Sequence, residues 1–363
     1  MPAKRSMMVD WDLAVSTASK MAGPGPTIAR SEAEAVVAEL RAGAQSSTPL
    51  VREFTGLVAS EGITRSAPLQ VVDRPGWIQA NVDGFATIIS PLVDRLQEKK
   101  GAPGPLAVSI GSRVTGVELG ALLGFMSTKV LGQFDPFYAP AGSPDESAGA
   151  GRLLLVAPNI VHVEKELGVD PTEFRLWVCL HEETHRVQFT AVPWMRDHIR
   201  SEIANLIESV EIDPAKLAGM VGEGVKRLSD LVRGNDDVSL LDLVQTPEQK
   251  VVLDRITGVM SLLEGHADVV MDGVGPEVIA SVAEIRRKFN ERRKGAGTFD
   301  RILRKLLGLD AKMDQYRNGA AFVRAVVDQV GMDGFNKVWV APENLPSKVE
   351  IGDPGSWVRR VHG

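Results

Sequence analysis

The sequence predicts a mainly α-helical fold with a small β-sheet. Two segments, Asp170-Pro171-Thr172-Glu173 and Thr246-Pro247-Glu248-Gln249, have the pattern of helix starts, in which a capping residue is followed by proline and then by glutamate or glutamine. Two short apolar runs, at residues 69–72 and 153–157, have the length of strands. With 363 residues and 44% hydrophobic content, the chain can bury a large core, as one domain or as two.

The first part of the chain is predicted to consist mainly of helices. Asp10 can cap the first helix, which Gly23-Pro24-Gly25-Pro26 breaks. Ser31 with Glu34 caps the second, and Thr48-Pro49 opens a third. The ranges expected are 10–22, from 31 onward, 50–60, 77–97 and 106–131.

A glycine stripe marks the last of these helices. Gly116, Gly120 and Gly124 are four residues apart, so another helix can pack closely against this face. Glu118 and Lys129 argue against a membrane dimer motif. Neither a G-x-G-x-x-G pattern nor a P-loop is present, which disfavours nucleotide binding.

The second part contains further helices and a tail rich in proline. A glycine- and serine-rich loop at 141–151 precedes the strand at 153–157, and helices are expected at 200–232, 299–307 and 310–330, with an acidic break at 234–237. Two basic runs, 286–288 and 292–294, indicate a solvated helix face or, alternatively, an anionic partner. Residues 339–357 are expected to form an irregular wrap. We divide the chain into regions 1–150 and 151–363, which could form one continuous domain.

The helix expected from Asp170 contains the run His181-Glu182-Glu183-Thr184-His185. Residues four apart lie on one face of a helix, so both imidazoles can bind a single metal ion. Glu182 projects beside that metal, where its carboxylate can take a proton from a bound water. Two neutral nitrogens and one carboxylate leave a fourth position open, an arrangement that suits zinc. The alternative is a solvated helix face on which Glu182, Glu183 and His185 pair with neighbours such as Arg186.

The two histidines continue an apolar stripe. The residues at helical spacing on this face are Phe174, Trp177, Val178, His181, His185 and Gln188. Two histidines on a buried face need a common partner, and a metal ion is the simplest one. Cys179 lies about 200° around the helix from His181, so we expect it to pack in the core and not to bind the metal.

A third ligand is expected on the helix opened by Thr246. Glu264 and Asp268 are four residues apart on this helix, so Glu264 can bind the metal while Asp268 accepts the outward N–H of a ligating histidine. Gly265 lets this helix approach the first one closely, and Gly273 is placed to end it. Surface charges are the alternative interpretation of the two carboxylates.

His266 is the rival ligand, but it points roughly 200° around the helix from Glu264 and could instead line the cleft. Hydrolysis also needs a donor for the oxyanion besides the metal. Tyr316, Arg317 and His266 are the polar candidates for this role, and each also has a purely structural interpretation.

These motifs resemble a known family. The Glu264-x-x-x-Asp268 spacing is similar to the second-helix signature of gluzincin metallopeptidases, and the HEETH and EGHAD pair, with the N-terminal start and the tail, resembles zincin-like proteins of actinobacteria and their relatives. The resemblance implies a mostly helical zincin-type fold with a zinc site, described for the family as hydrolase or zinc-dependent metalloprotease. Residues 10–14 resemble a branch associated with deazaflavin coenzyme biosynthesis.

The gap between His185 and Glu264 is longer than in ordinary gluzincins, so a helical insertion is expected. In zincins a strand edges the cleft and pairs with extended substrate, and we expect the strand at 153–157 to do so, or else to be a core strand.

Charge and composition narrow the class of protein. A net charge of −6 and a pI near 5.7 argue against a nucleic-acid binder. One cysteine excludes an internal disulfide framework and fits a reducing cytoplasm, where we expect the protein to act. The N-terminus has no apolar segment of a signal peptide, and no apolar run has the length of a membrane span.

Three functions follow from these motifs. The first is a zinc peptidase or related amide hydrolase acting on a peptide or amide substrate, with Glu182 as the general base. The second is a zinc-binding scaffold or partner protein with little peptidase activity. The third is a metal-dependent hydrolase of a small molecule linked to coenzyme biosynthesis. An open groove beside a strand would favour peptides, an enclosed cavity a small molecule, and a blocked metal face the scaffold.

Overall fold

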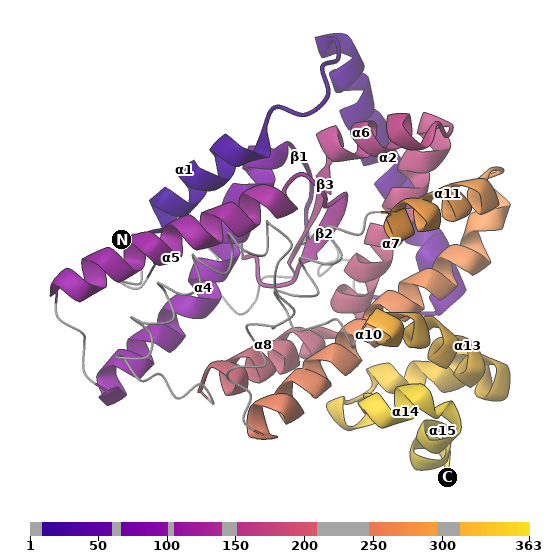
Figure 1. Ribbon diagram of the computed structural model, residues 1–363. Helices are drawn as coiled ribbons and strands as arrows, with labels where there is room; N and C mark the ends of the chain where they lie inside the picture. The colour runs from indigo at the N-terminus through magenta and orange to yellow at the C-terminus, as the bar shows by residue number, and fades with distance from the viewer. Residues whose placement is uncertain (1–8, 60–66, 101–104, 140–150, 209–246, 296–312) are drawn as a thin grey trace.

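A computed structural model describes residues 9–59, 67–100, 105–139, 151–208, 247–295 and 313–363 of the protein. The described chain is mostly helical and surrounds one small sheet (Figure 1). The fold class predicted from the sequence is therefore confirmed. Among the described residues, none of the helices combines the length and the apolar character that a bilayer crossing requires.

The elements before the metal motif are α1 (Trp11–Ala22), α2 (Arg30–Thr55), β1 (Leu69–Val72), α4 (Arg74–Lys100), α5 (Pro105–Met126), β2 (Gly132–Asp135), β3 (Arg152–Val156) and α6 (Ala157–Leu167). The later elements are α7 (Pro171–Ala191), α8 (Pro193–Glu208), α10 (Pro247–Val278), α11 (Val282–Gly295), α13 (Met313–Phe335), η2 (Asn336–Trp339), η3 (Pro342–Asn344), α14 (Lys348–Gly352) and α15 (Pro354–His362).

The sheet has the strand order β1-β3-β2. β3 pairs with β1 in parallel, Leu69 opposite Leu153, and with β2 in antiparallel, Gly132 opposite Leu155. Every residue of β3 is buried, which explains its continuous apolar run. Its expected role of pairing with substrate is therefore wrong, because both its edges are already hydrogen-bonded. The sheet contains two strands from region 1–150, β1 and β2, and one strand from region 151–363, β3.

The helices α1, α4 and α5 lie on one side of the sheet (Figure 1). The predicted glycine stripe of α5 faces α1, because a Cβ on Gly116 would lie 2.5 Å from the Asp10 carbonyl oxygen and one on Gly120 2.6 Å from that of Ala14. Gly124 meets the Ala18 carbonyl in the same way, at 2.9 Å. The two backbones can approach this closely only because all three residues lack a side chain.

On the other side, α2 packs along α7 and shares the main core with α7 and α10. The predicted break before Leu50 is wrong, because α2 is one helix with Pro49 inside it. Proline removes one backbone donor from the helix. In the turn before Pro49, the Ser47 hydroxyl donates to the Gly43 carbonyl at 2.7 Å.

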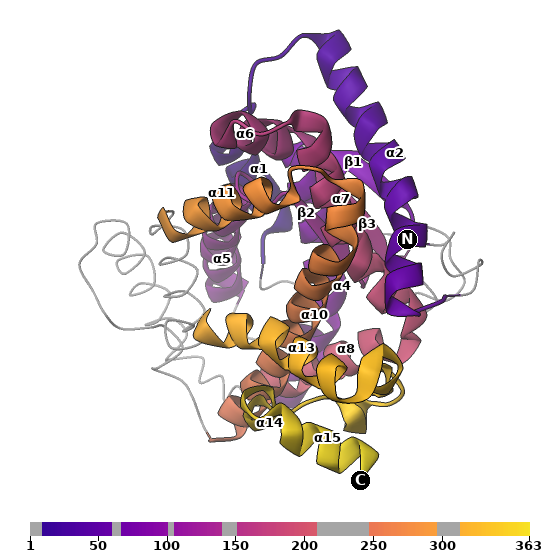
Figure 2. The same cartoon turned by 90° about the vertical axis from the view of Figure 1, so that its right-hand side faces the viewer.

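The C-terminal helices close the core around α10. In Figure 2, α13 crosses α10, and the crossing falls at two glycines, since a Cβ on Gly265 would overlap the backbone of Gly319. From the sequence, Gly265 was expected to allow a close approach of α10 to α7. This expectation is wrong, because the helix that packs against Gly265 is α13. Gly273 does not end α10 either; the helix runs on to Val278, and this glycine leaves room for the ring of Phe54.

The tail is helical, and the irregular wrap expected there is wrong. Pro342 and Pro354 occupy the first turns of η3 and α15, where a missing N–H costs nothing. Ser347 forms a capping box that starts α14. The acidic break at 234–237, the helix at 299–307 and almost all of the loop at 141–151 lie outside the described residues.

The contact between α1 and α5 gives a prediction about stability. Gly120→Ala should lower the free energy of unfolding by about 1–3 kcal/mol, because the new methyl group overlaps the α1 backbone. Gly111→Ala on the same helix is the matched control, since nothing lies within 4 Å of its added Cβ, and it should stabilise the protein by about 0.5–1 kcal/mol. Urea denaturation measures both. Equal effects of the two substitutions would contradict the packing described.

Candidate metal centre

Helix α7 carries the metal motif and begins as the sequence predicts. The Asp170 side chain accepts a hydrogen bond from the Glu173 N–H at 2.9 Å, and Pro171 occupies the first turn. Glu173 does not close the expected capping box; its carboxylate accepts the Ser281 N–H at 2.8 Å, just before α11. The start of α7 is thus tied to α11.

Three faces of α7 contact three different elements. Cys179 and Glu183 face α2, Glu182 faces β2, and the histidines with Gln188 face α10. The apolar residues before the motif, Phe174 and Val178 among them, are buried in the main core. A helix held on three sides gives its side chains fixed directions.

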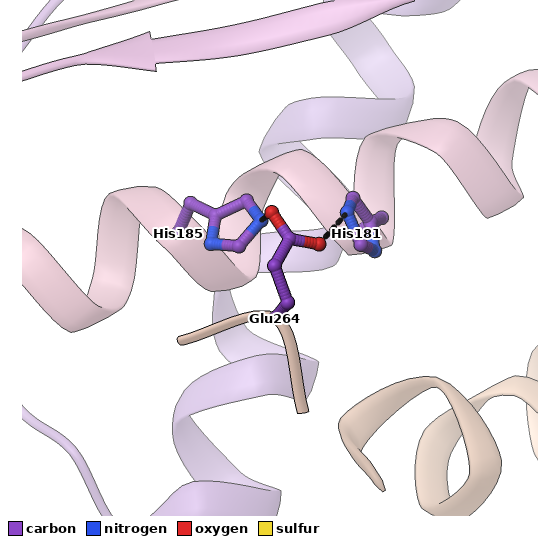
Figure 3. Close-up of side chains that lie close together, drawn as sticks. All are labelled: His181, His185 and Glu264. Atoms are coloured by element: carbon purple, nitrogen blue, oxygen red, sulfur yellow. Dashed lines mark ion pairs between the residues drawn. The ribbon is translucent and has the colours of Figure 1, made fainter. Parts of the chain in front are cut away.

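The histidine face of α7 meets Glu264 of α10. The Glu264 carboxylate lies between the two rings (Figure 3), with Oε2 3.7 Å from His181 Nε2 and Oε1 3.6 Å from His185 Nε2. One ligand atom from each residue lies within 4.8 Å of the others. The two rings are nearly perpendicular, with centroids 4.9 Å apart.

These distances fit a small tetrahedral cation. Ligand atoms about 2.0–2.1 Å from zinc in tetrahedral geometry are roughly 3.3–3.5 Å from one another. The observed separations of 3.6 and 3.7 Å need only small side-chain movements to reach that value. Two imidazoles and one carboxylate are also a ligand set that zinc takes in catalytic sites. The side chains of His181 and Glu264 are 25% and 40% exposed, so solvent reaches the site.

Glu182 lies against the first residue of β2. It is 7% exposed, and a Cβ on Gly132 would lie 2.5 Å from its Cδ and Cγ. Burial and, to a lesser degree, the negative charge of Glu264 raise the pKa of Glu182 to about 8. A cation at the site would act in the opposite direction. Because Gly132 has no side chain, the Glu182 carboxylate can occupy the space beside β2.

The neighbouring Glu183 has a different environment. It is fully buried towards α2, where it accepts a hydrogen bond from Thr48 at 3.1 Å and pairs with Arg186 at 3.3 Å. Burial raises its pKa to about 7. Cys179, on the same face, is buried against Gly43, and its thiol pKa is raised by burial. The expectation that Cys179 packs in the core is confirmed.

Gln188 is the site residue whose role the sequence did not indicate. Its Oε1 lies 3.0 Å from His185 Nδ1, and its Nε2 lies 3.0 Å from the Leu263 carbonyl oxygen. This is the outward nitrogen of His185, where Asp268 was one expected partner. The Asp268 carboxylate lies 3.7 Å from the Arg286 guanidinium. A spacing of three residues from His185 is the signal that could have identified Gln188.

His266 is a core residue, which corrects its expected place in the cleft or as an oxyanion donor. It is fully buried, stacks on Phe335 at 5.4 Å and meets Trp339 edge-on at 5.3 Å. Burial, followed by the nearby His185, lowers its pKa to about 3. Tyr316 and Arg317 belong to α13, but their side chains lie outside the described residues.

The chain is similar to known proteins over nearly its whole length. The model of a protein family described as zincin-like metallopeptidase matches residues 9–358. A crystal structure from Chloroflexus aurantiacus, described as "a putative hydrolase with a novel fold", is similar with a TM-score of 0.67 and 31% sequence identity, covering 97% of this chain and 98% of that one. No curated protein matches the chain.

The cluster gives a prediction about metal content. The purified protein should hold about one zinc per chain, and His181→Ala or His185→Ala should abolish binding, because two ligands alone hold zinc weakly. His162→Ala, an exposed histidine on α6, is the control and should keep the metal. Elemental analysis after dialysis measures all four proteins. Full zinc in both ligand variants would contradict the site.

Proposed function

Because the chain belongs to the zincin-like metallopeptidase family, we propose that it is a zinc-dependent hydrolase that cleaves peptide bonds. The observation that carries the proposal is the convergence of His181, His185 and Glu264 from two helices on one point. The similarity to the Chloroflexus structure over nearly the whole chain supports the class of hydrolase.

In this proposal, His181 and His185 would hold zinc through their Nε2 atoms and Glu264 through a carboxylate oxygen. Zinc in such a site lowers the pKa of a coordinated water and polarises a carbonyl. The exposure of Glu264 and His181 favours a working site over a blocked metal face, because substrate needs access from that side.

Glu182 acts as the general base in the proposed reaction. Its carboxylate takes a proton from the attacking water and then delivers it to the leaving amine. Its burial beside Gly132 supports this role, because a desolvated carboxylate is a stronger base than an exposed one. The neighbouring Glu183 is held by Thr48 and Arg186 on the face of α7 toward α2 and takes no part in the reaction.

We propose that β2 binds the substrate backbone. It is an edge strand of the sheet within the described chain, and it begins directly above Glu182. An extended peptide can add to such an edge through main-chain hydrogen bonds. Two side chains of β2 fix its position. The amide of Gln133 forms hydrogen bonds with the amide of Asn81 in α4 at 3.0 and 3.2 Å, and the ring of Phe134 stacks on that of Phe189 in α7 with centroids 5.2 Å apart. An edge strand beside the metal cluster favours an extended peptide over an enclosed small molecule as the substrate. A substrate connected with deazaflavin coenzyme biosynthesis remains the prediction of the N-terminal resemblance.

Catalysis and metal binding can be separated at Glu182. Glu182→Gln should keep the zinc but lower the rate of peptide cleavage about 10²–10⁴-fold, because the amide cannot accept the proton. Glu183→Gln is the matched control, a neighbouring buried glutamate, and should retain activity. Cleavage of a proteome-derived peptide mixture, followed by mass spectrometry, measures both. If Glu182→Gln cleaves as fast as the wild-type protein, its role as the base is excluded.

A further inference from the structure

We propose that Gln188 is a positioning residue that fixes the ring of His185 in one tautomer and sets α10 against α7. The inference rests on the proposed role of His185 as a metal ligand. Gln188 is 1% exposed and makes three polar contacts, with His185, Leu263 and His266. Two of its partners lie on α10, on either side of Glu264.

The backbone determines which way the Gln188 amide points. The Leu263 carbonyl can only accept a hydrogen bond, so the amide atom 3.0 Å from it must be the NH2 group. The other amide atom, which faces His185, is then the carbonyl oxygen. The orientation of the amide therefore follows from its hydrogen-bond partners, as such assignments require.

This orientation determines the tautomer of His185. The Gln188 Oε1 accepts only, so His185 Nδ1, 3.0 Å away, must carry the proton. In the neutral ring, Nε2 then keeps its lone pair, and it is Nε2 that lies 3.6 Å from Glu264. The hydrogen bond to Gln188 thus keeps His185 Nε2 unprotonated and directed toward the metal position before any metal binds.

The second N–H of Gln188 extends the chain of hydrogen bonds to His266. The distance from Nε2 to His266 Nδ1 is 2.9 Å, so this nitrogen accepts and the proton of His266 resides on Nε2. The ring of His266 is fixed in turn by Phe335 and Trp339. Trp194 of α8 donates to the Trp339 carbonyl at 2.9 Å. The C-terminal helical turn thereby supports the metal site through His266 and Gln188.

Gln188 also ties together the two helices that supply the ligands. Its own backbone belongs to the ligand helix α7, while Leu263 and His266 flank Glu264 on α10. The buried amide of Gln188 therefore affects both the orientation of the His185 ring and the position of Glu264. Loss of a residue that orients a metal ligand typically weakens metal binding about 10–100-fold.

The test uses Gln188→Met, which keeps the volume but removes the donor and the acceptor. The dissociation constant for zinc, from competition with a chelator, should rise about 10–100-fold. Asn159→Leu is the matched control, because Asn159 is also a buried amide that donates to two carbonyls, Ser127 and Val130, and accepts from Arg74, but away from the histidines. It should leave the zinc affinity unchanged.

A second measurement does not depend on zinc. In the zinc-free wild-type protein at mildly alkaline pH, ¹⁵N NMR should show His185 protonated at Nδ1, the signal being assigned with His185→Ala. Gln188→Met should show both tautomers. Unchanged zinc affinity in a folded Gln188→Met, or wild-type His185 protonated at Nε2, would overturn the assignment. A wild-type protein that binds no zinc would overturn the proposed function instead, and the tautomer would still decide the role of Gln188.

Discussion

The contact between α7 and α10 is the constraint on which the proposed site depends. His181 and His185 lie together on one helix, but Glu264 reaches them only because α10 is held at a fixed position beside α7. Two features hold it there. The buried amide of Gln188 bonds to the Leu263 carbonyl on the side facing α7, and Gly265 lets α13 press against α10 from behind.

The sheet contributes to the same site from the other direction. β3 is buried and hydrogen-bonded on both edges, so it serves as the frame that places β2. β2 in turn lies over α7 at Gly132, where a larger residue would displace Glu182. The proposed metal ligands and the proposed general base are therefore positioned by separate contacts of α7, the ligands by its contact with α10 and Glu182 by its contact with β2.

Local patterns predicted from the sequence correspond well to the structure. The start of α7, the spacing of its histidines and the placing of Glu264 follow from helix periodicity and capping, which act within a few residues. What was missed depends on tertiary contacts. β2 has four residues, two of them polar and one glycine, and forms because β3 offers it an edge. His266 is buried because aromatic rings of the C-terminal part surround it, which spacing along α10 alone cannot show.

A crystal structure of the zinc-loaded protein, with an anomalous map at the zinc edge, tests the central claim most directly. We expect one metal peak, with Nε2 of His181, Nε2 of His185 and a Glu264 carboxylate oxygen each about 2.0–2.2 Å from it. A metal held by other residues, or a Glu264 carboxylate turned away from the two histidines, would contradict the site.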